Sequence, residues 1–204
     1  THHPGLQIEI LGPPGPILLP PPPHWFGHRG HSAAWPLPRE MAAKMTLAAD
    51  VPPGAIEWQI ANANGGSGVG RFIVSLDREG IEDEQADEPQ VLDALPVTVS
   101  GRLFKNEEVD RYQWTSTEDG LMTVRLIRNV ARSFHGILAI HERETGDLVV
   151  DAVSRHSGDA VLTFWAKGGT DYIASVHDVD FTGNRSMVYR LKIARGTQVF
   201  AAVP

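Results

Sequence analysis

The sequence predicts an all-β protein with two β modules behind a proline-rich N-terminal arm. Its 204 residues include 20 Gly and 15 Pro and only 7% aromatics, a composition that favours short strands and tight turns over long helices. From about residue 45 onward, alternating apolar and polar runs recur between turn sequences such as NGG, TEDG and KGGT. Only the short stretch LPREMAAKM could form a helical turn.

Residues 1–43 form the predicted arm. The stretch LGPPGPILLPPPPHWFGHRGHSAAWPLPRE is too rich in proline for a helix or a central strand, because each proline removes a backbone donor and fixes φ. Trp25, Phe26 and Trp35 lie in this arm, where a core of their own is excluded. We therefore expect them to bind a neighbouring surface, either on this chain or on a partner protein.

Residues 44–78 are predicted to form a first, partial β unit. Three apolar runs, MTLAAD, AIEWQIA and GRFIVSL, are separated by the turns VPPG and NANGGSG, which is typical of an antiparallel meander. In the second run, Ile56, Trp58 and Ile60 share one face, so one side of this strand is expected to be buried.

Residues 79–94 are dense in acidic side chains and poor in apolar ones, so a solvated linker is predicted. Residues 95–194 form a second β module of sandwich or jelly-roll type, and residues 195–204 a tail. Trp58, Trp114 and Trp165 fall within predicted strands and are expected in the cores. The eight expected strands of the second module are PVTVSGRL, DRYQWT, LMTVRLIR, HGILAIHE, DLVVDAV, AVLTFWA, DYIASVHD and MVYRLKI.

The motifs LPVTVSGRL, EEVDRYQWTSTEDG, GDAVLTFWAKGGTDYIASVHD and YRLKI belong to this second module. With them it resembles the bacterial pre-peptidase C-terminal domain (PPC domain) of planctomycete-type secreted proteins. The preceding segment resembles the immunoglobulin-like unit that often stands before that domain. The resemblance implies an Ig-like sandwich, then a jelly-roll-like PPC sandwich, in a periplasmic or extracellular protein. The matching positions are Gly101, Arg102, Val109, Asp110, Tyr112, Trp114, Gly120, Tyr172, Asp178, Tyr189, Arg190 and Leu191.

The same resemblance makes Glu82, Glu84 and Asp87 candidate calcium ligands, because an acidic segment at this place helps to hold calcium in related collagen-binding modules. This sequence has Gln85 and Ala86 where the relatives have a Pro-Asn pair. Calcium needs six to eight oxygen ligands, so a solvated tether without metal is the competing interpretation.

The stretch HWFGHRGH raises a second metal hypothesis. On a helix, His24, His28 and His31 would share one face and could bind a transition metal or haem iron. Gly27 and Gly30 argue against such a helix, and loop packing or a partner contact is the alternative interpretation.

Several classes of function are excluded by composition. A net charge of −7 without a Lys/Arg cluster excludes a nucleic-acid partner. The absence of cysteine excludes disulfides and thiolate chemistry. No apolar run reaches the roughly 18 residues of a membrane span, which leaves peripheral membrane association through partners open. The stretch IHERETGD lacks the second histidine of a zincin helix, and adjacent turn carboxylates such as Glu107 and Glu108 are predicted to satisfy local backbone donors.

These observations predict a non-enzymatic, exported β protein without a required cofactor. We expect it to act as a scaffold, adhesion module or accessory subunit that binds protein partners in a larger extracytoplasmic or membrane-associated complex. Two alternatives remain open at this stage. One is an ancillary module that binds a polysaccharide or a protein beside a secreted hydrolase, with or without calcium. The other is a metal or haem carrier that uses the histidine cluster.

Overall fold

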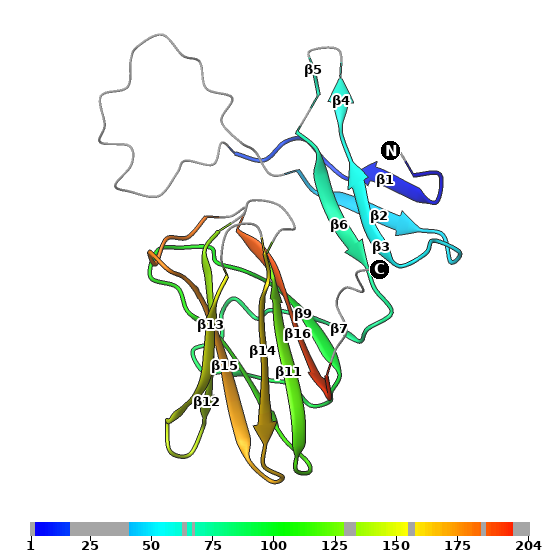
Figure 1. The fold of residues 1–204 in the computed structure, drawn as a ribbon. Coiled ribbons are helices and arrows are strands. Elements are labelled where there is room, and N and C mark those ends of the chain that lie inside the picture. Colours follow the sequence, from blue (N-terminus) through cyan, green and yellow to red (C-terminus); the bar gives the residue numbers. More distant parts are fainter. Residues whose placement is uncertain are drawn as a thin grey trace, which may run out of the picture. The chain divides into compact units, whose positions relative to one another are not determined.

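A computed structural model describes residues 3–16, 41–62, 65–66, 68–128, 134–154, 158–184 and 187–197. The chain divides into two compact units, Thr1–Leu76 and Asp77–Pro204. Every regular element among the described residues is a β-strand, which confirms the predicted all-β class (Figure 1). Within the described part of the chain, no helix is long and apolar enough to cross a bilayer.

The second unit consists of two five-stranded sheets. All eight strands that the sequence predicted here are present, close to their expected bounds. The first sheet has the spatial order β13 (Leu148–Val153), β12 (Gly136–Glu142), β15 (Asp171–Asp178), β10 (Asp110–Thr115), β8 (Gln90–Val91). The second has the order β14 (Ala160–Ala166), β11 (Gly120–Ile127), β16 (Val188–Arg195), β9 (Val97–Arg102), β7 (Glu79–Ile81).

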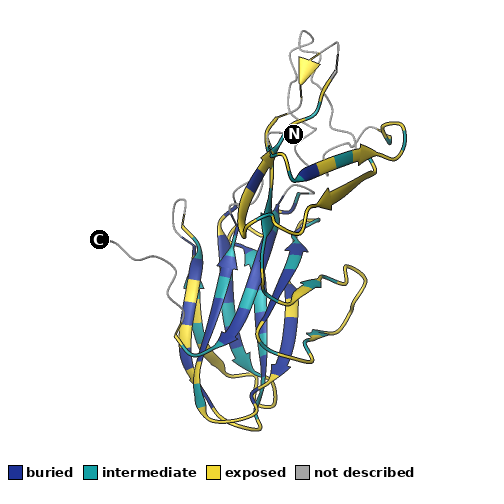
Figure 2. Cartoon of the chain, turned by 90° about the vertical axis from the view of Figure 1, so that its right-hand side faces the viewer, coloured by how far each residue is buried: buried dark blue, intermediate teal, exposed yellow. Residues whose placement is uncertain are grey.

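The core of the second unit lies between these sheets, to which each strand contributes its inward-facing side chains (Figure 2). In β14 the burial pattern alternates at every residue. Leu138, Val124 and Leu191 are fully buried, and burial of such a side chain contributes about 1.5–3 kcal/mol. Trp114 is also buried, as predicted, whereas Trp165 is 64% exposed. The expectation for Trp165 was wrong because its neighbours Phe164 and Ala166 occupy the inward positions of β14.

The acidic segment 79–94 is part of the sandwich, where the sequence predicted a solvated linker. Its strand β7 pairs in parallel with β9, and its strand β8 pairs in parallel with β10, so one segment forms an edge of both sheets. Acidic side chains of this segment and of the residues just before it form ion pairs with basic residues on the outer face of β16. Glu79 lies 2.6 Å from the Arg190 guanidinium, and Asp77 accepts a 3.0 Å hydrogen bond from the Lys192 ammonium. The acidic side chains therefore bind this segment to β16 through ion pairs, and they do not make it a solvated linker.

The described residues of the first unit form three two-stranded antiparallel ladders. In β1–β2 the residues Leu6, Ile8, Met45 and Leu47 lie on one face, since Leu6 is opposite Leu47 and Ile8 is opposite Met45. The ladders are β1 (Leu6–Ile10) with β2 (Ala43–Leu47), β3 (Gly54–Trp58) with β6 (Gly70–Val74), and β4 (Ala61–Asn62) with β5 (Gly65–Gly66).

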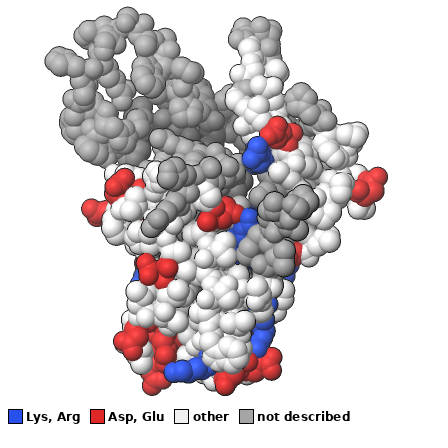
Figure 3. Space-filling view, in the orientation of Figure 1, with Lys and Arg blue, Asp and Glu red and all other residues white. Residues whose placement is uncertain are grey.

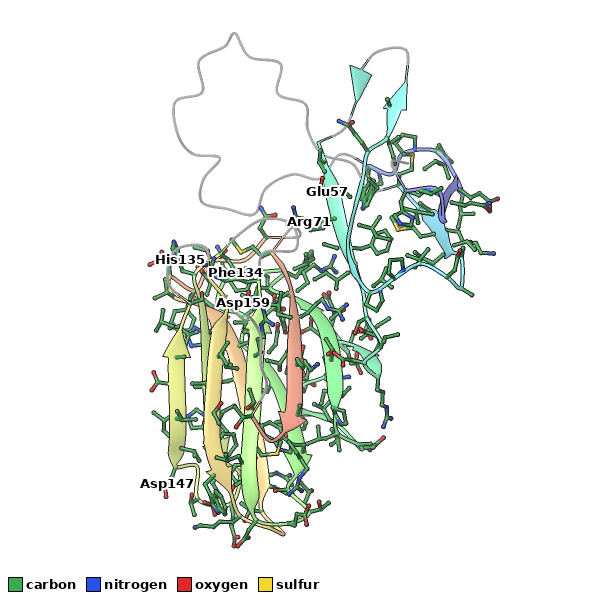
Figure 4. The ribbon with its side chains drawn as sticks, turned by 45° about the vertical axis from the view of Figure 1, so that its right-hand side comes forward. Glu57, Arg71, Phe134, His135, Asp147 and Asp159 are labelled. Carbon is green, nitrogen blue, oxygen red and sulfur yellow. The ribbon has the colours of Figure 1, made fainter. Side chains whose placement is uncertain are left out.

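Two details of the first unit differ from the sequence prediction. The segment 6–10, assigned to the arm, is a strand, because it precedes the dense prolines and alternates apolar and polar residues. The first strand of the expected meander therefore pairs with β1 and not with β3. The predicted face of the next strand is confirmed, since Ile56 is buried and Trp58 is half-buried. On the opposite face, Glu57 pairs with Arg71 at 2.7 Å (Figure 4).

Several predictions concern residues outside the described part of the chain. Trp25, Phe26 and Trp35, the proposed partner-binding aromatics, lie there. So do His24, His28 and His31, the candidate ligands of a transition metal. Both sets stay predictions, as does the immunoglobulin-like character of the first unit.

Candidate functional site

Four of the motif residues of the second unit meet at one place in the sandwich. Asp110 and Tyr112 begin β10, Tyr189 comes from β16, and Gly101 lies near the end of β9. The Tyr189 hydroxyl donates a 2.6 Å hydrogen bond to Oδ2 of Asp110, and it lies 2.7 Å from the Tyr112 hydroxyl. All three side chains are buried. The network thus connects β10 of one sheet with β16 of the other.

Gly101 makes this arrangement possible. A Cβ at this position would lie 2.5 Å from the Tyr189 ring and 2.8 Å from the Tyr112 hydroxyl, which is closer than atoms approach without displacement. The glycine of the Gly-Arg motif is therefore required by the two tyrosines, and not by a turn.

Next to this network, Arg102 binds two glutamates of the acidic segment 79–94. The Arg102 amide donates a 2.7 Å hydrogen bond to Oε2 of Glu82, while its guanidinium pairs with Glu84 at 2.6 Å. The guanidinium also lies 5.1 Å above the Phe104 ring. The single Arg102 side chain thus binds the segment through Glu84 and covers an aromatic ring.

Burial controls the protonation of this cluster. It raises the pKa of Asp110 to about 9, and the negative charge of Glu82 raises that pKa further. Burial also raises the pKa of Glu82, against the hydrogen bond from the Arg102 amide. The pKa values of Tyr112 and Tyr189 are raised as well, again chiefly by burial. These shifts favour the protonated forms of the Asp110 carboxyl and of both tyrosines.

A pocket of about 480 Å³ lies beside the network, and its lining is mainly acidic. Lys105 and Arg111 contribute its positive charges. On the face that Figure 3 shows, the described acidic and basic side chains of the second unit are interspersed. The residues that line the pocket are Glu82, Asp83, Glu84, Ala86, Glu88, Gln90, Lys105, Glu107, Glu108, Val109, Asp110, Arg111 and Tyr112.

The predicted calcium ligands Glu82, Glu84 and Asp87 contact groups of the same unit in this structure, and the calcium hypothesis stays a prediction. Glu82 accepts a backbone hydrogen bond, and Glu84 is neutralised by Arg102. The main-chain oxygen of Asp87 accepts a hydrogen bond from the Arg111 guanidinium. Among the residues that the structure describes, no three acidic or histidine side chains converge in a way that could hold a metal ion. Calcium requires six to eight oxygen ligands around one point.

The turn carboxylates bind main-chain groups of the sandwich. Glu108 accepts hydrogen bonds from the amides of Phe104 and Lys105, the latter at 2.9 Å. Asp119 accepts the Gly168 amide at 2.8 Å, and Glu118 pairs with Arg195 at 2.9 Å. Glu108 and Asp119 thus have the local structural role that the sequence predicted for turn carboxylates.

Sequence reasoning identified the motif residues but not their mutual contact. Asp110 and Tyr189 are 79 positions apart, so only the shared family pattern could have connected them. It also missed a second pocket of about 470 Å³ at the ends of β10 and β11, next to Trp114 and Arg195. The hydroxyl run Thr115, Ser116, Thr117 was the available signal for that pocket.

Comparison with known proteins gives structural likenesses only. No family model and no curated protein matches the sequence. The fold is similar to the pre-peptidase C-terminal domain of a collagenase from Bacillus anthracis, at 11% identity and a TM-score of 0.40, over 56% of this chain and 100% of that one. The collagenase domain belongs to the family that the motifs resemble.

Two further solved structures are similar. The sugar-binding EclA C-terminal domain has 17% identity and a TM-score of 0.31, over 54% of this chain and 86% of that one. Tripeptidyl peptidase 2 has 12% identity and a TM-score of 0.31, over 76% of this chain and 14% of that one. At these scores the likenesses carry no inference about activity or ligand.

Proposed function

We propose that this chain is a non-catalytic accessory subunit, a scaffold or adhesion component that binds protein partners in a larger extracytoplasmic or membrane-associated assembly. The observation that carries the proposal is the apolar face of β1–β2. On that face Ile10, Met45 and Leu47 are each 40–42% exposed, although they alternate regularly with polar residues. An apolar sheet face of this kind is stabilised when another surface covers it.

The chemistry of the second unit supports a role without catalysis. The polar groups of the Asp110–Tyr189–Tyr112 network are buried and hydrogen-bonded to one another, although Asp110 and Tyr112 also line the acidic pocket. The acidic groups around it hold backbone amides or basic side chains of the same unit. A hydrolase with paired carboxylates instead needs two groups that face each other across an open cleft.

The cysteine-free composition and the family resemblance support a location in the periplasm or outside the cell. In such a space, attachment to a membrane would occur through the partners that the apolar face binds.

Site-specific crosslinking in the native source tests the proposal. A photoreactive residue in place of Met45 should give a discrete adduct with another protein, because Met45 lies on the apolar face of β2. The same residue in place of Thr46, which points to the other face, is the matched control and should give much less adduct. Equal adducts at both positions, or none at Met45, would overturn the proposal.

The second candidate function is an ancillary polysaccharide-binding module. The pocket of about 470 Å³ beside Trp114 favours it, because the pocket combines apolar walls with hydroxyl-bearing side chains. A glycan screen with the full chain tests this candidate, and the crosslinking result does not affect it.

The third hypothesis, a metal or haem carrier, rests on His24, His28 and His31. Metal analysis of the purified chain, with and without replacement of these three residues by alanine, checks it.

A further inference from the structure

Strand β14 forms an open edge of the second unit. It stands at the end of its sheet, and within the described ranges it pairs with β11 alone (Figure 1). The strand is seven residues long, and it contains neither a charged residue nor a proline. Its register with β11 runs without a bulge. Long apolar edges of this kind are templates for pairing with another strand.

The other edge strands of the two sheets are protected. β7 and β8 are three and two residues long. β13 carries Asp151, and its pairing with β12 contains a bulge. Short edge strands, charged side chains and bulges are the devices by which proteins prevent edge pairing. Among the described strands of the second unit, β14 is therefore the one edge without such protection.

The ladder between β11 and β16 shows which main-chain groups of β14 face the open edge. The Gly196 amide donates a 2.7 Å hydrogen bond to the Leu121 carbonyl, so the main-chain groups of Leu121 face β16. Successive residues of an antiparallel strand face opposite neighbours, so Met122 exchanges hydrogen bonds with its opposite residue Phe164. The odd-numbered residues of β14, beginning with Val161, therefore present their N–H and C=O groups to the open edge.

The same residues of β14 also direct their side chains to the outer face of the sheet. Val161 is 40% exposed, Thr163 is exposed, and Trp165 is 64% exposed. Leu121, which lies opposite Trp165 in β11, is 40% exposed. An added strand would thus meet unpaired main-chain groups and an apolar outer strip at the same edge.

The sequence of β14 is complementary to itself in the antiparallel orientation. When two copies pair about a twofold axis at Thr163, Val161 of one copy lies opposite Trp165 of the other. The inward-facing Leu162 then lies opposite Phe164. In this register the residues that face the open edge are opposite one another, so each such pair exchanges both main-chain hydrogen bonds. Cross-strand pairs of an aromatic and a β-branched side chain stabilise a sheet.

The charges at the two ends of β14 fit the same register. Asp159 precedes the strand and Lys167 follows it, so the twofold axis places each opposite the other. Arg125 donates both of its hydrogen bonds to Oδ2 of Asp159, which leaves Oδ1 as an acceptor for lysine (Figure 4). The Lys167 ammonium has no ion pair within the described residues. A shift by two residues would instead place Asp159 opposite Trp165, or Lys167 opposite Val161.

We propose that this chain forms a symmetric dimer through β14, in which the β14 sheets of two copies join into one continuous antiparallel sheet. Thr163 lies at the twofold axis, and Trp165 of each copy covers Val161 of the other. The match of size and charge within β14 itself favours a second copy over a strand of another protein. This surface differs from the apolar face of β1–β2, so the inference is independent of the function proposed above.

Single cysteines test the register, because the chain has none of its own. The Cα atoms of a hydrogen-bonded antiparallel pair are about 5.5 Å apart, which suits a disulfide. Under mild oxidation, the full chain with Thr163→Cys should give a covalent dimer. Val161→Cys and Trp165→Cys should each stay largely monomeric alone and should crosslink when the two are mixed. Equal crosslinking of all three variants alone, or no dimer with Thr163→Cys, would overturn the proposal.

Sedimentation of the full chain tests the dimer without a crosslink. Concentrations of about 5–200 µM detect micromolar dissociation constants, and we expect a shift from monomer to dimer over this range. Thr163→Lys places two ammonium groups opposite each other and should raise the dissociation constant at least about tenfold. Thr115→Lys, at an exposed threonine of β10 in the other sheet, is the matched control and should leave it unchanged.

A chain that stays monomeric throughout this range, or a dimer that Thr163→Lys leaves intact, would contradict the proposal. So would an edge that pairs with a strand of another protein and never with a second copy. Circular dichroism checks that both lysine variants fold, and the cysteine variants decide the question if Thr163→Lys does not. Failure here leaves the crosslinking test at Met45 unaffected.

Discussion

The two units of the chain use the same strand pattern with very different results. Both contain strands in which apolar and polar residues alternate. In the second unit, ten strands in two sheets enclose one continuous core. In the first unit, Leu6 and Ile56 are the only hydrophobic residues that are buried among those described. Alternation therefore makes a strand amphipathic, but a stable module also requires a second sheet of matching size.

The largest effect should appear when the units are separated. We expect a fragment 77–204 to unfold cooperatively, within about 5 °C of the main transition of the full chain. A fragment 1–76 should show no cooperative transition, because isolated two-stranded ladders are at best marginally stable in water. Thermal unfolding followed by circular dichroism measures both. A cooperative transition in fragment 1–76 would mean that the first unit is a complete module.

Truncation of matched leucines should give the next largest difference. Leu191 is fully buried, so Leu191→Ala should reduce the free energy of unfolding by about 2–5 kcal/mol. Leu47 is 40% exposed, and Leu47→Ala should change it by about 0.5 kcal/mol or less. Urea denaturation of both variants provides the comparison. Similar losses of unfolding free energy in the two variants would contradict the conclusion that the second unit has the larger core.

Glycines extend the comparison to close packing. Gly101→Ala introduces a methyl group against Tyr189 and Tyr112 and should cost about 1–3 kcal/mol of unfolding free energy. Gly12 in the first unit has no atom within 4 Å of an added Cβ, so Gly12→Ala should have an effect within about 0.5 kcal/mol. Near-ultraviolet circular dichroism should change for Gly101→Ala, since the tyrosines must move. An unchanged spectrum would show that the tyrosines accommodate the methyl group.

A further contrast between the two units lies in their pH dependence. Because the pKa of Asp110 rises from 3.8 to about 9 on folding, the folded chain holds a proton that the unfolded chain releases between these values. Stability from this group is full below about pH 4 and decreases as pH rises toward 9. Asp110→Asn should flatten that decrease, since the amide oxygen still accepts from Tyr189. The measurement is the melting temperature from about pH 5 to about pH 9. Glu57→Gln in the first unit is the control, and an equal flattening there would contradict the assignment.

Much of the second unit could be predicted from sequence because its strands are local patterns. The regular alternation of β14 and β15 is visible without any tertiary information. What the alternation did not reveal was the direction of Trp165, since an aromatic residue at an outward position has the same sequence signature as one at an inward position. The neighbours Phe164 and Ala166 decide the question only when the whole strand is considered.

The acidic segment was misjudged for a different reason. Its charge resembled that of a solvated linker, but Glu79 finds Arg190 across 111 residues of sequence. An ion pair between residues far apart in the sequence has no local sequence signature. Composition alone therefore could not distinguish a solvated linker from an edge strand. The same holds for the candidate site, in which Asp110 and Tyr189 belong to two separate motifs of the family pattern.

The pairing of β9 with β16 has a consequence for how the molecule is made. Val97 of β9 is opposite Ile193 of β16. During synthesis, β9 therefore leaves the ribosome about ninety residues before its partner strand β16 is made. During that time β9 and β11 both have an open edge where β16 will insert. Open edges of this kind invite pairing with other nascent chains. A chaperone or a secretion channel that keeps the polypeptide extended until β16 has been made would therefore favour correct assembly.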